Sequence, residues 1–102
     1  MRKTFSELIN SGQPVLADFY ADWCMPCKTM SPILKDVAQQ LKDKAVIIKI
    51  DVDSPKNAAV VSRYGITSIP TLMLFKDGKN VWQQSGVTSA TDLQQVIQRY
   101  AE

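Results

Sequence analysis

The sequence predicts an α/β fold: one domain over residues 1–102, with a central mixed β-sheet flanked by helices on both sides. Two nearly continuous apolar runs, residues 15–21 and 45–50, are typical of central strands covered on both faces. The segment between them carries a one-sided apolar stripe at helical spacing, which indicates a βαβ unit with parallel strands. A hairpin at the Asp77-Gly78 turn adds two antiparallel strands. A chain of this length is large enough for one hydrophobic core and too small for two.

Local signals place the first elements. Thr4 and Glu7 have the spacing of a capping box, which predicts a short helix to about Asn10. The strand over 15–21 leads to Cys24, where the main helix begins. Pro32 removes one backbone donor inside this helix and should kink it rather than end it, because the apolar stripe continues. The stripe consists of Met30, Ile33, Leu34, Val37, Ala38 and Leu41.

The second half of the chain shows similar signals. Ser54-Pro55 and Gly65 are typical of a helix start and stop, so a third helix is predicted over 55–64. The remaining elements are a strand over 71–76, its antiparallel partner over 80–85 and a last helix that Ser89 caps. The apolar face of that helix is formed by Leu93, Val96, Ile97 and Tyr100.

Composition and charge exclude several classes of protein. Hydrophobic residues make up 45% of the chain and charged residues 22%, which is a globular balance. The net charge of +2 is spread without a basic run or an interleaved aromatic patch, so nucleic-acid binding is not indicated. No apolar run approaches the roughly 20 residues that span a bilayer, and no export-type run of about 7 to 15 follows the basic start. We therefore expect a monomeric cytoplasmic protein that makes no membrane contact.

Both cysteines lie in the hexapeptide Trp23-Cys24-Met25-Pro26-Cys27-Lys28. A zinc site within the chain would need two more ligands of the usual kind, but the sequence has no histidine and no third cysteine. Two further interpretations are a zinc ion shared between chains and a pair of cysteines that only packs in the core. A CxxC beside a βαβ pattern favours a redox pair that cycles between dithiol and disulfide. We therefore predict thiol-disulfide chemistry and no metal.

The two sulfurs should differ in reactivity. Cys24 lies at the amino end of the main helix, where unpaired amides and the helix dipole favour the thiolate. Cys27 lies one turn inside and should face the sheet. Cys24 is therefore the predicted nucleophile, presented to the substrate, and Cys27 resolves the mixed disulfide. Lys28 is expected to be solvated.

Asp18 and Lys49 are each the only charged residue in a predicted central strand. A buried carboxylate is costly without a partner, so we expect these two side chains to pair. Desolvation should raise the pKa of Asp18 and Lys49 should oppose that rise, which makes Asp18 a proton acceptor for the deeper thiol of Cys27. A purely structural ion pair is the alternative.

Pro70 and Trp23 are two further candidates. Pro70 marks an end of the strand that follows it, because proline cannot donate to a sheet ladder. The residues alone leave its peptide bond open, with an ordinary trans turn as the starting expectation. Trp23 stands at a strand-to-helix turn, which favours a partly exposed position near the thiols over a place in the core.

The sequence resembles the thioredoxin family over almost its whole length. The matching residues occur in the family's order and approximate spacing: Asp18-Phe19-Tyr20-Ala21-Asp22-Trp23-Cys24, Pro26-Cys27-Lys28, Pro32, Lys49 with Asp53, Tyr64-Gly65-Ile66, Ile69-Pro70-Thr71, Phe75-Lys76 and Gly86. The resemblance implies the thioredoxin fold and disulfide reductase activity on protein substrates. It also implies re-reduction by a flavoprotein thioredoxin reductase that draws on NADPH, with no cofactor bound to the domain itself.

The resemblance also implies roles for individual residues. Cys24 is similar to the family's nucleophile, Cys27 to its resolving thiol, Asp18 to its buried proton acceptor beside Lys49, and Pro70 to its cis-proline opposite the disulfide. Backbone groups near Ile69 are implied to pair with an extended substrate segment. The implied substrate-binding rim consists of Trp23, Met25, Pro26, Ile69, Pro70, Gly86 and Val87.

Three departures from the family pattern lie near this site. Met25 replaces the usual glycine of the motif, Tyr20 a common tryptophan, and Ser68 a glycine that often precedes the Ile-Pro pair.

Three functions compete: an electron donor that reduces protein disulfides, an oxidant or isomerase whose disulfide form is the active reagent, and a binding module without turnover. The reduction potential separates the first two, and replacement of both cysteines by serine separates them from the third.

Overall fold

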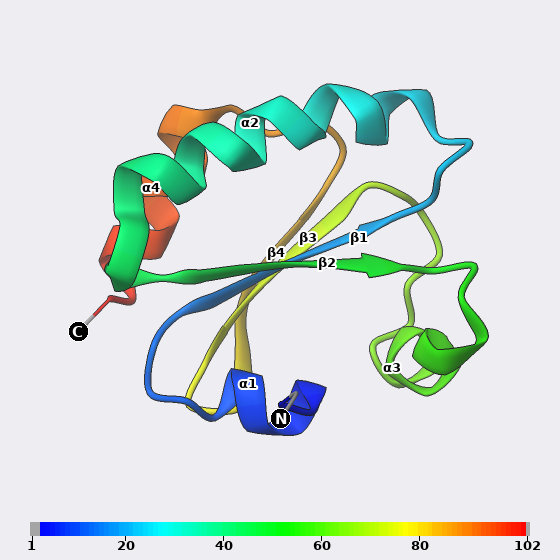
Figure 1. Ribbon diagram of the computed structural model, residues 1–102, viewed down its shortest axis with the longest axis horizontal. Coiled ribbons are helices and arrows are strands. Elements are labelled where there is room, and N and C mark those ends of the chain that lie inside the picture. Colours follow the sequence, from blue (N-terminus) through cyan, green and yellow to red (C-terminus); the bar gives the residue numbers. More distant parts are fainter. Residues whose placement is uncertain (1–2, 102) are drawn as a thin grey trace.

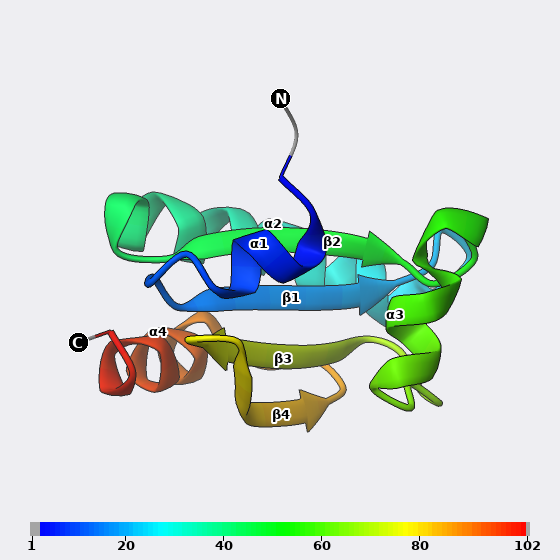
Figure 2. The same cartoon turned by 90° about the horizontal axis from the view of Figure 1, so that it is seen from below.

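A computed structural model describes residues 3–101 and contains one four-stranded sheet in the order β2-β1-β3-β4 (Figure 2). The strands β1 (Val15–Tyr20) and β2 (Val46–Asp51) are parallel, as the βαβ pattern predicted. The expectation that both are central strands covered on both faces is wrong for β2, which lies at the edge of the sheet described by residues 3–101 and is mostly half-buried. The strands β3 (Thr71–Lys76) and β4 (Lys79–Ser85) form an antiparallel hairpin, and β3 also pairs antiparallel with β1. The mixed sheet expected from the sequence is therefore confirmed.

Helices cover both faces of this sheet (Figure 1). The helices α2 (Met25–Leu41) and α4 (Ala90–Arg99) pack on one face, over a cluster that includes Leu16 and Leu72. The short helices α1 (Phe5–Ile9) and α3 (Ala58–Arg63) pack on the other face. Across residues 3–101, none of the helices combines the length and apolarity that a membrane crossing needs.

The local signals at the chain's turns produce the expected structures. Thr4 and Glu7 form both hydrogen bonds of the capping box, and the Ser89 side chain accepts from the backbone N–H of Asp92. Pro32 lies inside α2, which continues to Leu41. In the β3–β4 turn, Asp77 and Gly78 have positive φ values of 52° and 81°, which matches the turn geometry that favours a short hairpin.

The helix predicted over residues 55–64 is shorter and divided. Pro55–Asn57 forms a 3₁₀ turn, η2, and the α-helix begins only at Ala58. The Ser54 side chain makes no capping bond, while the Asn57 amide donates to the backbone oxygen of Asp51 at 2.9 Å. This bond ties the turn to the end of β2. A second 3₁₀ turn, η1 (Lys42–Lys44), links α2 to β2.

Strand alternation determines which side chains of β1 can reach the cysteines. Val15, Ala17 and Phe19 pack on the α1 and α3 side, whereas Leu16 packs under α2 and α4. Because successive side chains of a strand point to opposite faces, Asp18 projects with Leu16 onto the α2 side. The chain then leaves β1, turns, and enters α2 at Cys24. The fold thus places a charged strand residue below the start of the helix that carries both sulfurs.

Candidate active site

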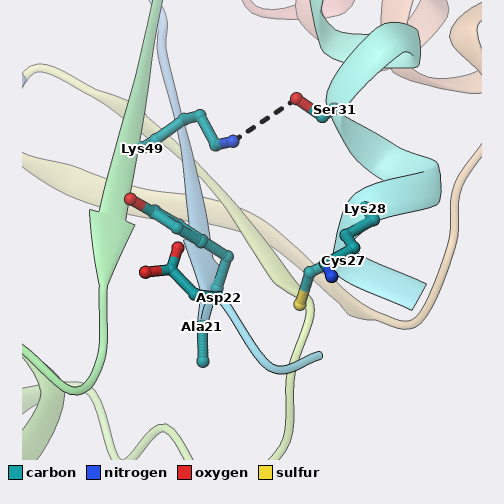
Figure 3. Close-up of a pocket in the computed structure, with 7 residues that line it drawn as sticks. Ala21, Asp22, Cys27, Lys28, Ser31 and Lys49 are labelled. Carbon is teal, nitrogen blue, oxygen red and sulfur yellow. Dashed lines mark hydrogen bonds between the residues drawn. The ribbon is translucent and has the colours of Figure 1, made fainter. Parts of the chain in front are cut away.

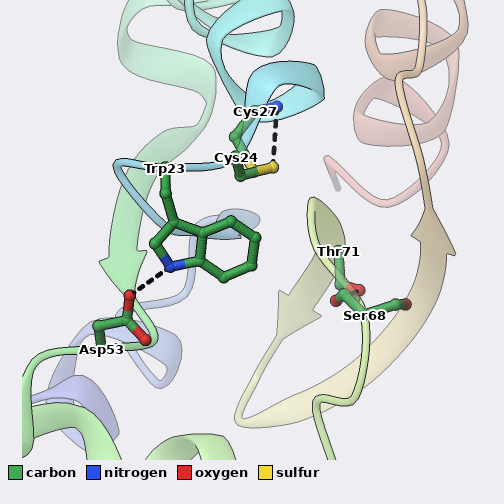
Figure 4. The surroundings of a disulfide bond; sticks show 6 residues. All are labelled: Trp23, Cys24, Cys27, Asp53, Ser68 and Thr71. Carbon is green, nitrogen blue, oxygen red and sulfur yellow. Dashed lines mark hydrogen bonds between the residues drawn. A yellow bond between two sulfur atoms is a disulfide. The ribbon is translucent and has the colours of Figure 1, made fainter.

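Cys24 and Cys27 form a disulfide at the start of α2, with their Cα atoms 5.3 Å apart. Cys24 is the N-cap of the helix, and its sulfur accepts a hydrogen bond from the backbone N–H of Cys27 at 3.2 Å (Figure 4). In the dithiol state this donor and the positive end of the helix dipole favour a negative charge on the Cys24 sulfur. The geometry therefore gives Cys24 the environment of a nucleophilic thiolate.

In the disulfide state Cys24 and Cys27 are equally buried. Each cysteine retains only 4% of its surface, and both pack with Ala21 and Ile69 in one small cluster. The turn between β1 and α2 and the loop before β3 close over both sulfurs. The helix-end environment, rather than exposure, distinguishes the two residues.

Exposed apolar side chains surround this buried disulfide. Trp23 and Met25 each expose 69% of their surface and Val87 exposes 47%. Pro26 is exposed and Gly86 is half-buried, but Pro70 is buried and so supports the rim from below. The Trp23 indole N–H donates to the Asp53 carboxylate at 2.7 Å (Figure 4), which fixes the orientation of an otherwise exposed ring.

An apolar groove of about 230 Å³ begins at this rim. Trp23 and Ile69 form its end nearest the disulfide, and α3 and the loop before β3 form the remainder. Its other lining residues are Val52, Val61, Ile66, Thr67 and Ser68. Val52, Val61 and Ile66 were not predicted as site residues because nothing in their local sequence distinguishes them from core positions.

The loop opposite the disulfide contains a cis peptide bond between Ile69 and Pro70, as the family resemblance implied. The backbone N–H of Gly86 donates to the Pro70 carbonyl at 2.8 Å. Ser68, where the family often has glycine, donates its hydroxyl to that of Ser85 at 3.2 Å, and the Thr71 hydroxyl donates to the Ser68 carbonyl at 2.6 Å. The serine at this position therefore fastens the loop to β4.

Asp18 is fully buried, and within residues 3–101 neither of its carboxylate oxygens has a hydrogen-bond partner. The expected buried pair with Lys49 is therefore wrong, although the two residues occupy matching positions on β1 and β2. Lys49 is exposed, and its ammonium lies 3.4 Å from the Ser31 hydroxyl and 4.5 Å from the centre of the Tyr20 ring. Its long aliphatic stem allows the charge to stay in solvent while the backbone remains in the sheet.

Burial raises the pKa of Asp18 from its ordinary value of 3.8 to about 6, and the positive charge of Lys49 partly opposes this rise. The rise in the pKa of Asp18 is the shift expected from the sequence. A carboxyl group with a pKa in this range changes its protonation state close to neutral pH, as a residue that accepts and returns a proton must do.

A second cavity, of about 180 Å³, opens beside Cys27 (Figure 3). Cys27, Lys28 and Ser31 from α2 line one side, and Lys49 from β2 lies across from them. Tyr20, Ala21 and Asp22 complete the lining. Sequence reasoning missed Ser31, although its spacing of four residues from Cys27 places both on one helix face.

Among residues 3–101, no group of three or more histidine, cysteine, aspartate or glutamate side chains is placed to hold a metal ion. The site instead combines a helix-capping CxxC disulfide, a buried carboxylate and a cis-proline loop at one end of a mixed sheet. This combination defines the class of thiol-disulfide oxidoreductases.

Comparisons with known proteins assign the family. The family model described as Thioredoxin matches residues 1–99. Thioredoxin 1 of Synechococcus elongatus is 42% identical over 94 residues, which cover 92% of this chain and 86% of that protein. Thioredoxin Y1, chloroplastic, of Arabidopsis thaliana is 44% identical over 91 residues, covering 89% of this chain and 52% of that protein. The structure of a mutant thioredoxin from Halobacterium salinarum superposes with a TM-score of 0.84 at 39% identity, covering 95% of this chain and 82% of that one.

The chain belongs to the thioredoxin family. It is an oxidoreductase of thiol-disulfide exchange, and its substrates are proteins that contain disulfides. The Cys24–Cys27 disulfide is its redox-active group.

Proposed function

We propose that this chain is a general reductant of protein disulfides, which passes two electrons from Cys24 and Cys27 to its substrates. The observation that carries the proposal is the buried, unpartnered Asp18 carboxylate on the α2 side of the sheet, as seen within residues 3–101. Tyr20, two residues further along β1, packs against the cysteine cluster, so the carboxylate and the sulfurs share one side of the sheet.

The first step is attack by the Cys24 thiolate on one sulfur of a substrate disulfide. A bond forms between Cys24 and that sulfur, the substrate S–S bond breaks, and the second substrate sulfur leaves as a thiolate that takes a proton from water. The N–H of Cys27 and the start of α2 stabilise the attacking thiolate. The product of this step is a mixed disulfide.

The second step resolves the mixed disulfide. Asp18 accepts the proton of the Cys27 thiol, and the resulting thiolate attacks the Cys24 sulfur. The Cys24–Cys27 bond forms, the bond between Cys24 and the substrate breaks, and the substrate sulfur leaves as a thiolate that takes a proton from water. Asp18 then releases its proton to solvent, and the substrate carries two reduced sulfurs. A pKa of about 6 lets Asp18 stand ionised and ready near neutral pH.

The same carboxylate supports the direction of electron flow. A CxxC protein is a strong oxidant when its surroundings stabilise the reduced, thiolate-containing form. A buried carboxylate with no hydrogen-bond partner within residues 3–101 acts in the opposite sense, because its negative charge disfavours a nearby thiolate. The reduced pair is then more ready to give up its electrons.

Protein substrates bind at the exposed rim and in the groove beside it. Trp23 and Met25 present large apolar surfaces next to the disulfide, and the groove of about 230 Å³ continues from Trp23. An extended substrate segment would pair with the backbone near Ile69 and place apolar side chains against Val87 and the groove. Pro26 and Gly86 complete the contact surface, with Pro70 beneath it.

The proposal extends to the electron source and the compartment. Re-reduction requires a thioredoxin reductase that draws on NADPH, and the domain itself carries no further cofactor. We place the cycle in the cytoplasm, where the thiol pool is kept reduced. Two of the relatives are named as chloroplastic, so trapping the redox state of the cysteine pair in fractionated cells is the test of location.

The decisive experiment is NADPH-coupled reduction of a generic protein disulfide in the presence of a thioredoxin reductase. We expect turnover by the wild-type chain, none by Cys24→Ser, and accumulation of a mixed disulfide by Cys27→Ser. Failure with several reductases would refute the assigned electron source. The reduction potential is measured in parallel, and a value at the oxidising end of the family's range would favour an oxidant or isomerase.

A double variant, with both cysteines replaced by serine, separates catalysis from binding. The proposed function predicts that this variant loses all disulfide reduction. A biological activity that survives the double replacement would identify the chain as a binding module and contradict the proposal.

A further inference from the structure

Lys49 occupies the strand position that matches Asp18, yet within residues 3–101 its ammonium makes no hydrogen bond to that carboxylate. The two residues are paired in register on parallel strands, and neighbouring strands lie about 4.8 Å apart, so both side chains leave the same face of the sheet. A lysine stem easily spans that distance. Both Asp18 oxygens nevertheless lack a hydrogen-bond partner in the part of the chain that the structure describes.

Two contacts account for the position of the lysine charge. Its Nζ atom donates to the Ser31 hydroxyl on α2 at 3.4 Å, the bond dashed in Figure 3. The same atom lies 4.5 Å from the centre of the Tyr20 ring at the end of β1. Ser31 follows Cys27 by one helical turn, and Tyr20 follows Asp18 on the same side of its strand. Both groups line the cavity beside Cys27.

We propose that Ser31 and Tyr20 are positioning residues that hold the Lys49 ammonium away from Asp18, so that the carboxylate stays available to the Cys27 thiol. This inference rests on the proposed function of Asp18 and adds the device that keeps it unpaired. The chain has Tyr20 in place of a common family tryptophan, and the tyrosine ring supplies the aromatic face for the lysine.

Among the charged groups around Asp18, Lys49 has the largest influence on the pKa of its carboxyl group. Strand β2 contributes Lys49 and, two residues further, Asp51; the β3 residue opposite Asp18 is the uncharged Leu72. The titratable groups from the other elements that line the adjoining cavity are Tyr20, Asp22, Cys27 and Lys28. An ammonium within about 4 to 6 Å lowers the pKa of a carboxyl group by roughly 1 to 3 units, so movement of Lys49 alone would change the proton affinity of Asp18.

The test is direct titration of the Asp18 carboxyl by ¹³C NMR in the oxidised protein, where the cysteines do not titrate. We expect Ser31→Ala to lower the pKa of Asp18 by about 1 unit, because Lys49 is then able to reach the carboxylate. Ser31→Thr retains the hydroxyl and should keep the wild-type value. Tyr20→Leu should act like Ser31→Ala, and Tyr20→Phe, which keeps an aromatic face, should not.

A double variant distinguishes positioning from a general structural effect. In a Lys49→Met background, Ser31→Ala should leave the Asp18 titration unchanged, because no ammonium remains to move. No shift in the single Ser31→Ala variant, or an equal shift with and without Lys49, would overturn the inference. Neither result depends on the direction of electron flow, so the proposed reductase activity stands or falls separately.

A kinetic readout connects the titration to the reaction. In a single-turnover experiment, release of a substrate from its mixed disulfide with Cys24 should rise with pH as Asp18 ionises. We expect Ser31→Ala to move the midpoint of this rise to lower pH by the same amount as in the NMR titration. An unchanged midpoint despite a shifted Asp18 titration would contradict a role for the positioning pair in catalysis.

Discussion

Replacement of Asp18 by asparagine should change how the stability of the oxidised protein depends on pH. Asp18 is fully buried, and its carboxylate oxygens have no partner within residues 3–101. The folded protein therefore binds the proton of this carboxyl more tightly than the unfolded chain does. Asparagine has nearly the same shape but no charge, so it removes this difference and leaves the packing of β1 intact.

The magnitude follows from the raised pKa. The pKa of Asp18 is about 6 in the folded protein, against an ordinary value of 3.8. At pH values well below 3.8 both states are protonated and the group makes no difference to folding. As the pH rises from about 4 through about 6 the unfolded state loses its proton first, so wild-type stability falls, by about 3 kcal/mol in total.

Urea unfolding of the oxidised wild type and the Asp18→Asn variant at about pH 3 and about pH 8 measures this term. The buried amide has its own desolvation cost, about 1–3 kcal/mol, but that cost is the same at both pH values. The variant should therefore gain about 3 kcal/mol relative to the wild type between the acidic and the alkaline measurement. Asp36→Asn is the matched control, because Asp36 is an exposed aspartate on α2.

The reasoning would be refuted if the unfolding free energies of variant and wild type differed by the same amount at acid and alkaline pH. Asp18 would then have the same proton affinity in the folded and the unfolded state. If the variant instead lost stability relative to the wild type as the pH rose, the Asp18 carboxylate would be stabilised by a cation in the folded protein. That result would restore the buried ion pair with Lys49 that residues 3–101 do not form in the structure.

Three further predictions concern the rim and the amino terminus. Met25→Gly removes an exposed side chain, so it should change the rates with different protein substrates by more than it changes the reduction potential. Unchanged substrate rates with a shifted potential would contradict this. Asp53→Ala should release the Trp23 indole and raise the KM for protein substrates while kcat is retained, and a selective loss of kcat would count against it. Thr4→Ala should cost about 1 kcal/mol of unfolding free energy by removing the α1 cap, with Thr4→Ser as the control that keeps it.

Local sequence signals predicted most of the fold. The apolar runs identified β1 and β2, the capping box identified α1, and the Asp77-Gly78 pair located the hairpin. These predictions were correct because backbone geometry and side-chain periodicity are set by residues close together in the chain. The helix expected over 55–64 was less accurate: Ser54 makes no capping bond, the first turn is 3₁₀, and the Asn57 amide bonds instead to the backbone of Asp51 at the end of β2.

In the redox site, too, local sequence predicted some features and tertiary packing determined others. Two cysteines three residues apart at a predicted helix start were sufficient to identify the chemistry, and the local helix-end environment, which the structure contains, is the basis for predicting Cys24 as the nucleophile. The apolar groove was not predictable, since Val52, Val61 and Ile66 come from three different segments of the chain. Only packing shows that their side chains line a surface next to Trp23.

Residues close together in the chain were enough to establish an α/β fold with a polarised CxxC pair and one buried acid behind it. What that acid contacts was settled by packing between distant segments. Asp18 and Lys49 carry opposite charges at matching strand positions, and a sequence offers no reason to keep them apart. The flexible lysine stem can place its charge at several points, and Ser31 and Tyr20, brought together from α2 and β1, determine which point it takes.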